Sequence, residues 1–157
     1  MKLLVALDLS DSTEIIMNQV KKIAKPLSAS VCIIHNAEPE PDVLEFKTDP
    51  LAARESLSKK FHQEHHQIQE IAEQLRAEGL NATALLVHGP SVKTILEEAE
   101  KLDVNMIVLG THGKSAMYQL ILGSVSEGVL HKSRFPVLVI PTRKQTDIDS
   151  SPTDNSA

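Results

Sequence analysis

Short runs of hydrophobic residues alternate with amphipathic stretches along the chain. Continuous runs at 3–7 and 31–34, and less uniform ones at 82–88 and 104–109, are typical of strands buried on both faces. A fifth run at 137–140 lies between two prolines. Because these strands alternate with helical patterns, the sequence predicts a single doubly wound α/β domain. Its parallel sheet should carry helices on both faces, joined by right-handed crossovers.

The first helical pattern falls between the first two runs. Hydrophobic residues step by four, three and four positions from Ile16 to Leu27, which indicates a helix over this stretch. Asp11, followed three positions later by Glu14, resembles a capping arrangement at the start of that helix. The proline-rich, acidic stretch at 37–50 then predicts a loop.

Three more helices are expected further along the chain. Hydrophobic positions from Leu57 to Leu75 mark a long amphipathic helix, which Gly79 should end. A third helix should follow Pro90, and a fourth should run to about His131. Together with the five strands, these helices complete the alternation of a doubly wound domain.

Composition narrows the class of protein. The 157 residues suit one domain, and 41% hydrophobic with 24% charged residues is ordinary for a globular chain. From Thr142 onward the chain is polar and lacks periodicity, so we expect a domain at 1–141 and a disordered tail at 142–157. No hydrophobic run approaches the ~20 residues of a membrane span. The expectation is therefore a soluble, cytoplasmic protein without membrane insertion.

Charge and ring content argue against nucleic-acid binding. Sixteen Lys and Arg against 21 Asp and Glu give a net charge of −5, which disfavours electrostatic capture of DNA, RNA or anionic lipid. With no Trp, one Tyr and three Phe, few rings are available to stack on bases. Cys32 is the only cysteine, which excludes an intrachain disulfide and a cysteine-cluster zinc site. Its apolar strand predicts an inert core thiol.

Two residues lie where a ligand is expected in such a fold. Ligands of open α/β sheets bind beyond the carboxyl ends of the strands, where the strand order reverses. Asp8 ends the first predicted strand, and Gly110 follows the fourth. A role for Asp8 in capping the next helix is the alternative, although Ser10 and Asp11 are better placed for it.

A glycine-rich segment begins directly after the fourth predicted strand. Gly110, Gly113, Gly123 and Ser124 form the pattern G-x2-G-x9-G-S. A P-loop would need a glycine where Val108 stands, and no G-x-G-x-x-G follows the first strand. Glycines let a backbone approach a ligand closely, and the N–H groups of a helix start attract anions. The alternative is that these glycines only turn a strand and let two helices pack.

The segment from Gly110 to Ile140 resembles the universal stress protein family, in its nucleotide-binding branch. The pattern G-x2-G-x9-G-(S/T) is that branch's signature, and the chain matches it without a gap. The resemblance spans about residues 2–141, with Asp8 at the end of the family's first strand. It implies a five-stranded sheet of order 3-2-1-4-5 and a homodimer. Because the fifth strand lies at the sheet edge in this order, we expect the dimer to pair through it. It also implies ATP, or the related ADP or AMP, at the switch point, with Mg²⁺ accompanying the nucleotide.

The resemblance also implies which residues contact the nucleotide. Asp8 and the main chain at Asn36 resemble adenosine contacts, although Ala6 stands where ATP-binding members often carry proline. The first two glycines would line the ribose and phosphates, and the segment from Gly123 to Ser126 would cradle the phosphates. The complete set of implied contacts is Ala6, Asp8, Asn36, Leu109, Gly110, Thr111, His112, Gly113, Lys114, Gly123, Ser124, Val125 and Ser126.

Four histidines are weaker candidates for a functional site than the glycine segment. His35 and His88 end predicted strands, where structural histidines are commoner than catalytic ones. His62 and His66 are spaced to share a metal ion, but the H-E-x-x-H order of zinc proteases is absent. We therefore expect neither a metal site of the protein's own nor a catalytic residue.

Three functions fit the sequence. The first is a nucleotide-binding stress or signalling regulator that acts on an unknown partner protein. The second is a slow ATP hydrolase, but hydrolysis needs a base that positions water, and beyond Asp8 no acidic residue lies near the glycine segment. The third is a structural dimer without nucleotide, against which the complete glycine pattern argues.

Overall fold

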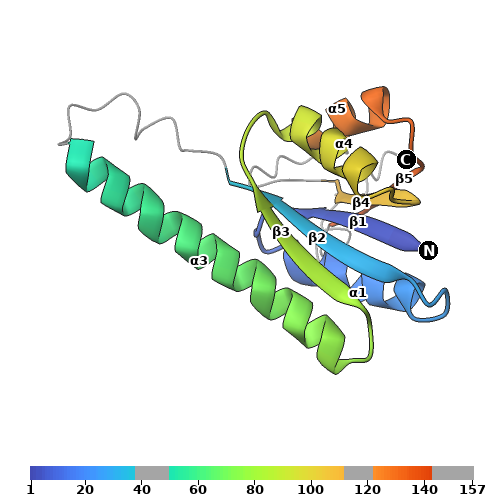
Figure 1. The fold of residues 1–157 in the computed structure, drawn as a ribbon. Helices are drawn as coiled ribbons and strands as arrows, with labels where there is room; N and C mark the ends of the chain where they lie inside the picture. The colour runs from blue at the N-terminus through green and yellow to red at the C-terminus, as the bar shows by residue number, and fades with distance from the viewer. Residues whose placement is uncertain (38–49, 112–121, 143–157) are drawn as a thin grey trace, which may run out of the picture.

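In a computed structural model, which describes residues 1–37, 50–111 and 122–142, five strands form one parallel sheet (Figure 1). They are β1 (Lys2–Leu7), β2 (Ser30–Asn36), β3 (Ala82–Val87), β4 (Met106–Gly110) and β5 (Val137–Ile140). Their order is β3-β2-β1-β4-β5, as the family resemblance implied. The chain winds outward from β1 to β3 and then crosses back to β4, so the switch point lies between β1 and β4.

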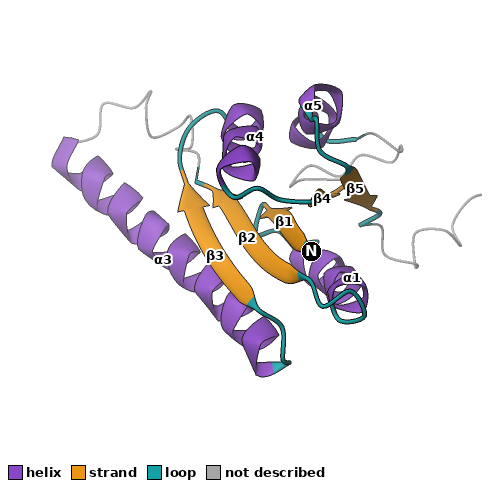
Figure 2. Cartoon of the chain, turned by 45° about the vertical axis from the view of Figure 1, so that its right-hand side comes forward, coloured by secondary structure: helices purple, strands orange, loops and turns teal. Residues whose placement is uncertain are grey.

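Helices cover both faces of this sheet, as the alternating pattern predicted. The described helices are α1 (Thr13–Ala24), α3 (Pro50–Ala77), α4 (Ser91–Lys101) and α5 (Ser124–Lys132). Figure 2 shows α1 and α3 on one face, with α4 and α5 on the other. Side chains alternate between the two cores: Leu3 and Val5 pack toward α1 and α3, whereas Leu4 packs toward α4 and α5.

The first helix is shorter than its hydrophobic spacing predicted. It ends at Ala24, and Leu27 is 50% exposed rather than buried. Pro26 explains this end, because proline has no N–H to continue the helical hydrogen bonds. The expected capping arrangement is also absent, since the residue at the helix N-cap is Ser12 and its side chain makes no capping hydrogen bond.

The long helix α3 contains 28 residues and begins at Pro50, the last position of the predicted loop. Proline fits the first turn of a helix, where its missing N–H has no partner to lose. Ile68, Ala72 and Leu75 are fully buried against the sheet, whereas the N-terminal end of α3 projects past β3 (Figure 1). Gly79 adopts φ +87° just after the helix, which confirms the predicted glycine stop. No described helix is long and apolar enough to cross a membrane.

An ion-pair cluster ties the end of α3 to the end of α1. The Glu78 carboxylate lies 2.5 Å from Lys21 Nζ and 2.8 Å from Lys25 Nζ. These two lysines lower the pKa of Glu78 from 4.5 to about 2. Because the charged form is favoured in the folded state, its contribution is present above pH 4.5 and is lost as the pH falls toward 2.

Glu78→Gln should therefore lower the melting temperature at neutral pH, by a small amount because the cluster is exposed to solvent. The difference from the unaltered chain should shrink as the pH falls from 4.5 toward 2. Thermal denaturation followed by circular dichroism across this range measures the effect, with Glu73→Gln at an exposed position of α3 as the control. A pH-independent difference would show that the carboxylate charge plays no part.

The packed domain extends one residue beyond the boundary predicted from composition. Thr142, which composition placed in the polar tail, is only 8% exposed. Its backbone N–H donates to Thr111 Oγ1 at 3.1 Å, and the two threonine hydroxyls lie 3.1 Å apart. The packing of Thr142 depends on a residue 31 positions earlier, which local composition does not reveal. Residues 143–157 lie outside the described part of the chain.

A chain truncated after residue 144 should keep the melting temperature of the full chain, because it retains Thr142 and both of its contacts. Truncation after Pro141 removes them, at about 1 kcal/mol for each hydrogen bond. For a domain of this size, a loss of about 2 kcal/mol lowers the melting temperature by roughly 4–8 °C. Equal melting temperatures for the two truncated chains would show that Thr142 does not stabilise the fold.

Candidate functional site

The candidate site lies where the carboxyl ends of β1, β2 and β4 meet. Parallel pairing places Leu7 beside His35, and Asp8 and Asn36 come next at the same edge of the sheet. Gly110 ends β4, which pairs with β1 on its other side. The fold therefore brings together residues that lie about a hundred positions apart in the sequence.

Asp8 carries a buried polar atom without a hydrogen-bond partner at this edge, among the described residues. Its Oδ1 accepts a hydrogen bond from the Ser10 N–H at 3.0 Å. Its Oδ2 is buried and has no hydrogen-bond partner among the described residues. Leaving such an atom unpaired costs about 1–3 kcal/mol or more, so the position suits a ligand that donates a hydrogen bond. Asp8 does not cap α1, since its contact is to the turn that precedes that helix.

Asn36 is tied to the start of α4 by its side chain. Its Nδ2 donates to Gly89 O at 2.8 Å and to Ser91 Oγ at 2.7 Å. The side-chain amide therefore holds the β3–α4 connection in place. Ala6 is half-buried and packs with the core on the α4 and α5 face. The adenosine contact implied at Asn36 was one of its main chain, and this arrangement is compatible with it.

The two halves of the glycine segment meet in space. The Gly123 N–H donates to Thr111 O at 2.9 Å, and the Thr111 N–H donates to Ile140 O at 3.0 Å. The Ser126 hydroxyl donates to Gly110 O at 2.8 Å. The end of β4 and the start of α5 are thus joined directly. The predicted contacts at His112, Gly113 and Lys114 lie outside the described residues.

The two described glycines of the pattern, Gly110 and Gly123, lie in different environments. A Cβ atom on Gly110 would lie 2.8 Å from Ile16 Cδ1 and 3.0 Å from Thr142 Cγ2, closer than such atoms pack. These contacts, made with the ends of two side chains, favour packing as the reason for the glycine at position 110. Gly123 has φ −59° and ψ 152°, which any residue can adopt. Backbone strain therefore does not explain the glycine at position 123.

The start of α5 offers hydrogen-bond donors. The N–H groups in the first turn, from Ser124 to Ser126, have no acceptor within the helix. The helix dipole adds a partial positive charge there, which favours an anion. Ser124 is exposed, whereas Ser126 is buried with its hydroxyl proton committed to Gly110. The geometry therefore suits an anionic group held by main-chain N–H groups, with Ser124 as the available hydroxyl.

The histidines at the strand ends make structural contacts. His35 is 6% exposed, and its Nδ1 lies 2.7 Å from Leu7 O. His88 Nδ1 lies 3.2 Å from Ala37 O, and its ring meets the edge of the Phe61 ring at 4.7 Å between centroids. The sequence did not reveal that Glu64 of α3 approaches His35. The predicted helix around Glu64 contains both polar and apolar residues, so nothing local indicates that this glutamate lies toward the sheet.

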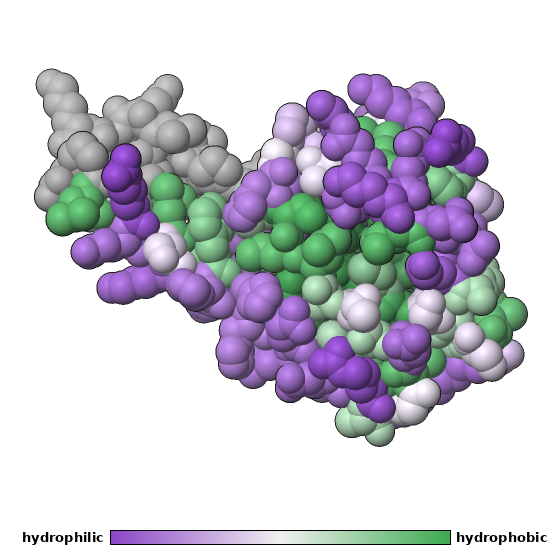
Figure 3. Space-filling view, viewed as in Figure 1, coloured by the Kyte–Doolittle hydropathy of each residue, from purple (hydrophilic) through white to green (hydrophobic). Residues whose placement is uncertain are grey.

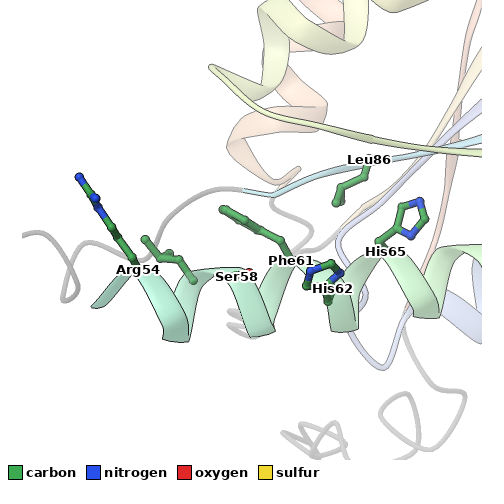
Figure 4. Close-up of a pocket in the computed structure, with 7 residues that line it drawn as sticks. Arg54, Ser58, Phe61, His62, His65 and Leu86 are labelled. Carbon is green, nitrogen blue, oxygen red and sulfur yellow. The ribbon is translucent and has the colours of Figure 1, made fainter. Parts of the chain in front are cut away.

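A separate hollow lies between α3 and β3, with a volume of about 510 Å³. Figure 4 shows Phe61 and Leu86 on its inner side, with Arg54 pointing outward. Figure 3 shows apolar surface over the same side of the molecule, between the polar surfaces of α3 and α4. This hollow contains none of the predicted nucleotide contacts and was not predicted from the sequence. The residues that line it are Arg54, Leu57, Ser58, Phe61, His62, His65 and Leu86.

His66 and Cys32 are two further residues that the sequence singled out. His66 Nδ1 lies 3.4 Å from Glu70 Oε1 on the exposed face of α3. Within 1–37, 50–111 and 122–142, no three His, Cys, Asp or Glu side chains form a group that could hold a metal ion. Cys32 is buried, and burial raises the pKa of its thiol. A raised pKa keeps the thiol protonated and unreactive, in agreement with a core position.

Comparison with known proteins agrees with this architecture. The chain is 32% identical over 144 residues to the "universal stress protein in QAH/OAS sulfhydrylase 3′region" of Thermus aquaticus, covering 88% of this chain and 96% of that protein. Among solved structures it is similar to MJ0577 of Methanocaldococcus jannaschii, with 28% identity, coverage of 92% and 96%, and a TM-score of 0.79.

A more distant structure shares the fold alone. It is the universal stress protein of Archaeoglobus fulgidus in complex with dAMP, which is 20% identical, with coverage of 89% and 97% and a TM-score of 0.59. The family model described as "Universal stress protein family" matches residues 1–141, almost the whole chain. The chain therefore belongs to the universal stress protein family.

Proposed function

We propose that this protein binds ATP or a related adenine nucleotide at the switch point of its sheet. In this proposal it is a cytoplasmic stress or signalling regulator, and nucleotide occupancy changes its interaction with a partner protein. The observation that carries the proposal is the buried Asp8 Oδ2, which has no hydrogen-bond partner among the described residues. A nucleoside offers hydroxyl and amine donors that such an oxygen can accept.

Charge supports one orientation of the nucleotide. Asp8 would repel phosphates, so the nucleoside belongs at Asp8 and the phosphates belong at the start of α5. The main chain from Leu109 to Thr111 would then lie along the ribose, together with His112 and Gly113. Lys114 would approach the phosphates. Mg²⁺ would accompany the phosphates as part of the bound nucleotide. We propose no metal site formed by the protein alone.

A relative supports the chemical class of ligand. The universal stress protein of Archaeoglobus fulgidus was solved in complex with dAMP, which is an adenine nucleotide. The proposed site in this chain would use the same class of ligand. ATP is the first candidate.

We also propose a homodimer paired through β5. This strand lies at an edge of the sheet, and three of its four apolar residues are only half-buried in the single chain. Proteins normally cover such edges, and a two-fold axis would pair β5 with its own copy. Sedimentation at micromolar concentration should show a dimer. A monomer alone under these conditions would contradict this part of the proposal.

Mass spectrometry of the supernatant from freshly purified, heat-denatured protein tests nucleotide binding directly. We expect a stoichiometric adenine nucleotide, or stoichiometric ATP binding by calorimetry if none is retained during purification. Absence of both would favour the nucleotide-free structural dimer. Phosphate release from added ATP should stay far below about 1 per second, the low end of typical enzyme turnover. Turnover at that rate would favour the hydrolase instead.

A further inference from the structure

Two largely buried polar side chains, Glu64 and His35, lie between helix α3 and the site at the end of β1. Glu64 Oε2 of α3 lies 3.5 Å from His35 Nε2, and these side chains are 15% and 8% exposed. His35 Nδ1 lies 2.7 Å from Leu7 O. A carbonyl oxygen only accepts hydrogen bonds, so Nδ1 must carry the proton of that bond. Nε2 is then the nitrogen that faces the Glu64 carboxylate. At 3.5 Å the two atoms are within ion-pair distance when the ring is protonated, and neither has a hydrogen-bond partner among the described residues.

The Leu7 carbonyl is the last backbone group before Asp8. Leu7 C=O and Asp8 N–H belong to one planar peptide unit, so a hydrogen bond to Leu7 O fixes the plane from which Asp8 departs. On the other side of Asp8, its Oδ1 accepts from the Ser10 N–H, across Leu9 with φ 56°. The carboxylate of Asp8 is therefore held from both sides. His35 supplies one of the two restraints.

Stability alone is a poor explanation for Glu64. On α3, Glu64 lies between the half-buried Phe61 three positions earlier and the fully buried Ile68 four positions later. An apolar side chain there would extend the hydrophobic face of the helix. Buried ion pairs contribute little or no net stability compared with apolar side chains of similar size. A role in holding His35 explains the presence of a carboxylate better.

We propose that Glu64 is a positioning residue for nucleotide binding. It orients His35, which in turn fixes the Leu7–Asp8 peptide and thereby the direction of the Asp8 carboxylate. This inference rests on the proposed nucleotide site and adds to it a residue outside the glycine segment, on a helix on the opposite face of the sheet from α5. Glu64 itself does not touch the nucleotide in this arrangement.

The test compares three variants by ATP calorimetry and thermal denaturation. Glu64→Leu replaces the carboxylate with an apolar side chain of similar size. The melting temperature of this variant should therefore stay near that of the unaltered chain. Its ATP Kd should rise about tenfold, as expected for the loss of one polar restraint. Glu64→Gln keeps a polar side chain whose amide can donate to His35 Nε2, so it should restore the Kd to within about twofold of the unaltered value. Glu70→Leu makes the same charge change at an exposed position of α3 and should leave the Kd unchanged.

Amide NMR of the ligand-free proteins gives a second readout. Glu64→Leu should shift the signals of Asp8 to Ser10, whereas Glu70→Leu should not. Unchanged ATP affinity in Glu64→Leu would overturn the positioning role, as would equal loss of affinity in Glu64→Leu and Glu64→Gln. Failure of the unaltered protein to bind ATP would overturn the proposed function, and the positioning role with it. The two failures are therefore distinguishable.

Discussion

Gly123→Val should abolish the stabilisation of the protein by ATP while leaving its fold intact. For the unaltered chain, ATP at 100 times its Kd should add about 2.7 kcal/mol to the free energy of unfolding. This corresponds to a rise in melting temperature of roughly 5–10 °C for a domain of this size. In the variant, the branched side chain would occupy the space in which phosphate oxygens meet the N–H groups at the start of α5, so the rise should vanish.

The backbone of Gly123 makes this a clean experiment. Its φ of −59° and ψ of 152° are accessible to valine, and its N–H bond to Thr111 O involves no side chain. Circular dichroism and dimerisation should therefore match those of the unaltered chain. Ser124→Ala is the milder companion, because it removes one hydroxyl donor, worth about 1–3 kcal/mol toward a charged group. A full ATP-dependent shift in Gly123→Val would disprove the assignment of the phosphates to this segment.

Gly110→Ala should destabilise the fold itself, whether or not nucleotide is present. The added Cβ would lie 2.8 Å from Ile16 Cδ1 and 3.0 Å from Thr142 Cγ2, so both side chains must move. Overpacking of this kind costs about 1–3 kcal/mol. At about 2–4 °C per kcal/mol, the melting temperature should fall by roughly 2–12 °C. Thermal denaturation without nucleotide measures the effect.

Ile16→Val provides the matching control, because it removes the Cδ1 atom that the new Cβ would contact. Alone, this change should cost about 0.5–1.5 kcal/mol. Combined with Gly110→Ala, it should recover part of the lost stability, so the two effects should not add. Strict additivity would show that the Ile16 contact is not the reason for the glycine. Unchanged stability in Gly110→Ala would reject the packing explanation altogether.

Local patterns were sufficient for the elements and the class of fold. Buried parallel strands give continuous apolar runs, and each of the five predicted runs overlaps a strand of the sheet. The strand order came from the resemblance carried by the glycine segment, because periodicity alone does not say which strands are neighbours. Boundaries were less accurate where single residues decide them, as at Pro26, which ends α1 before Leu27.

The candidate site was predictable in position but not in its contacts. The sequence predicted that Asp8 and Gly110 lie at the switch point because both come at strand ends, and the family resemblance added Gly123. It left open whether Gly110 serves packing or ligand approach, and only the distances to Ile16 and Thr142 favour packing. It also could not show that Asp8 Oδ2 is buried, since burial depends on elements from the whole chain.

The sequence by itself determined the alternation of strands and helices and the two apolar cores, because the spacing of hydrophobic residues is a property of neighbouring positions. It also determined the glycine pattern. Only the tertiary structure decided which polar side chains meet. Glu64 and His35 lie 29 positions apart, as Thr111 and Thr142 lie 31 apart, and each pair forms because the sheet brings distant segments together. In an isolated segment these side chains would be hydrated by water. In the fold they are wholly or partly withdrawn from water, and the polar group that each one approaches belongs to another element.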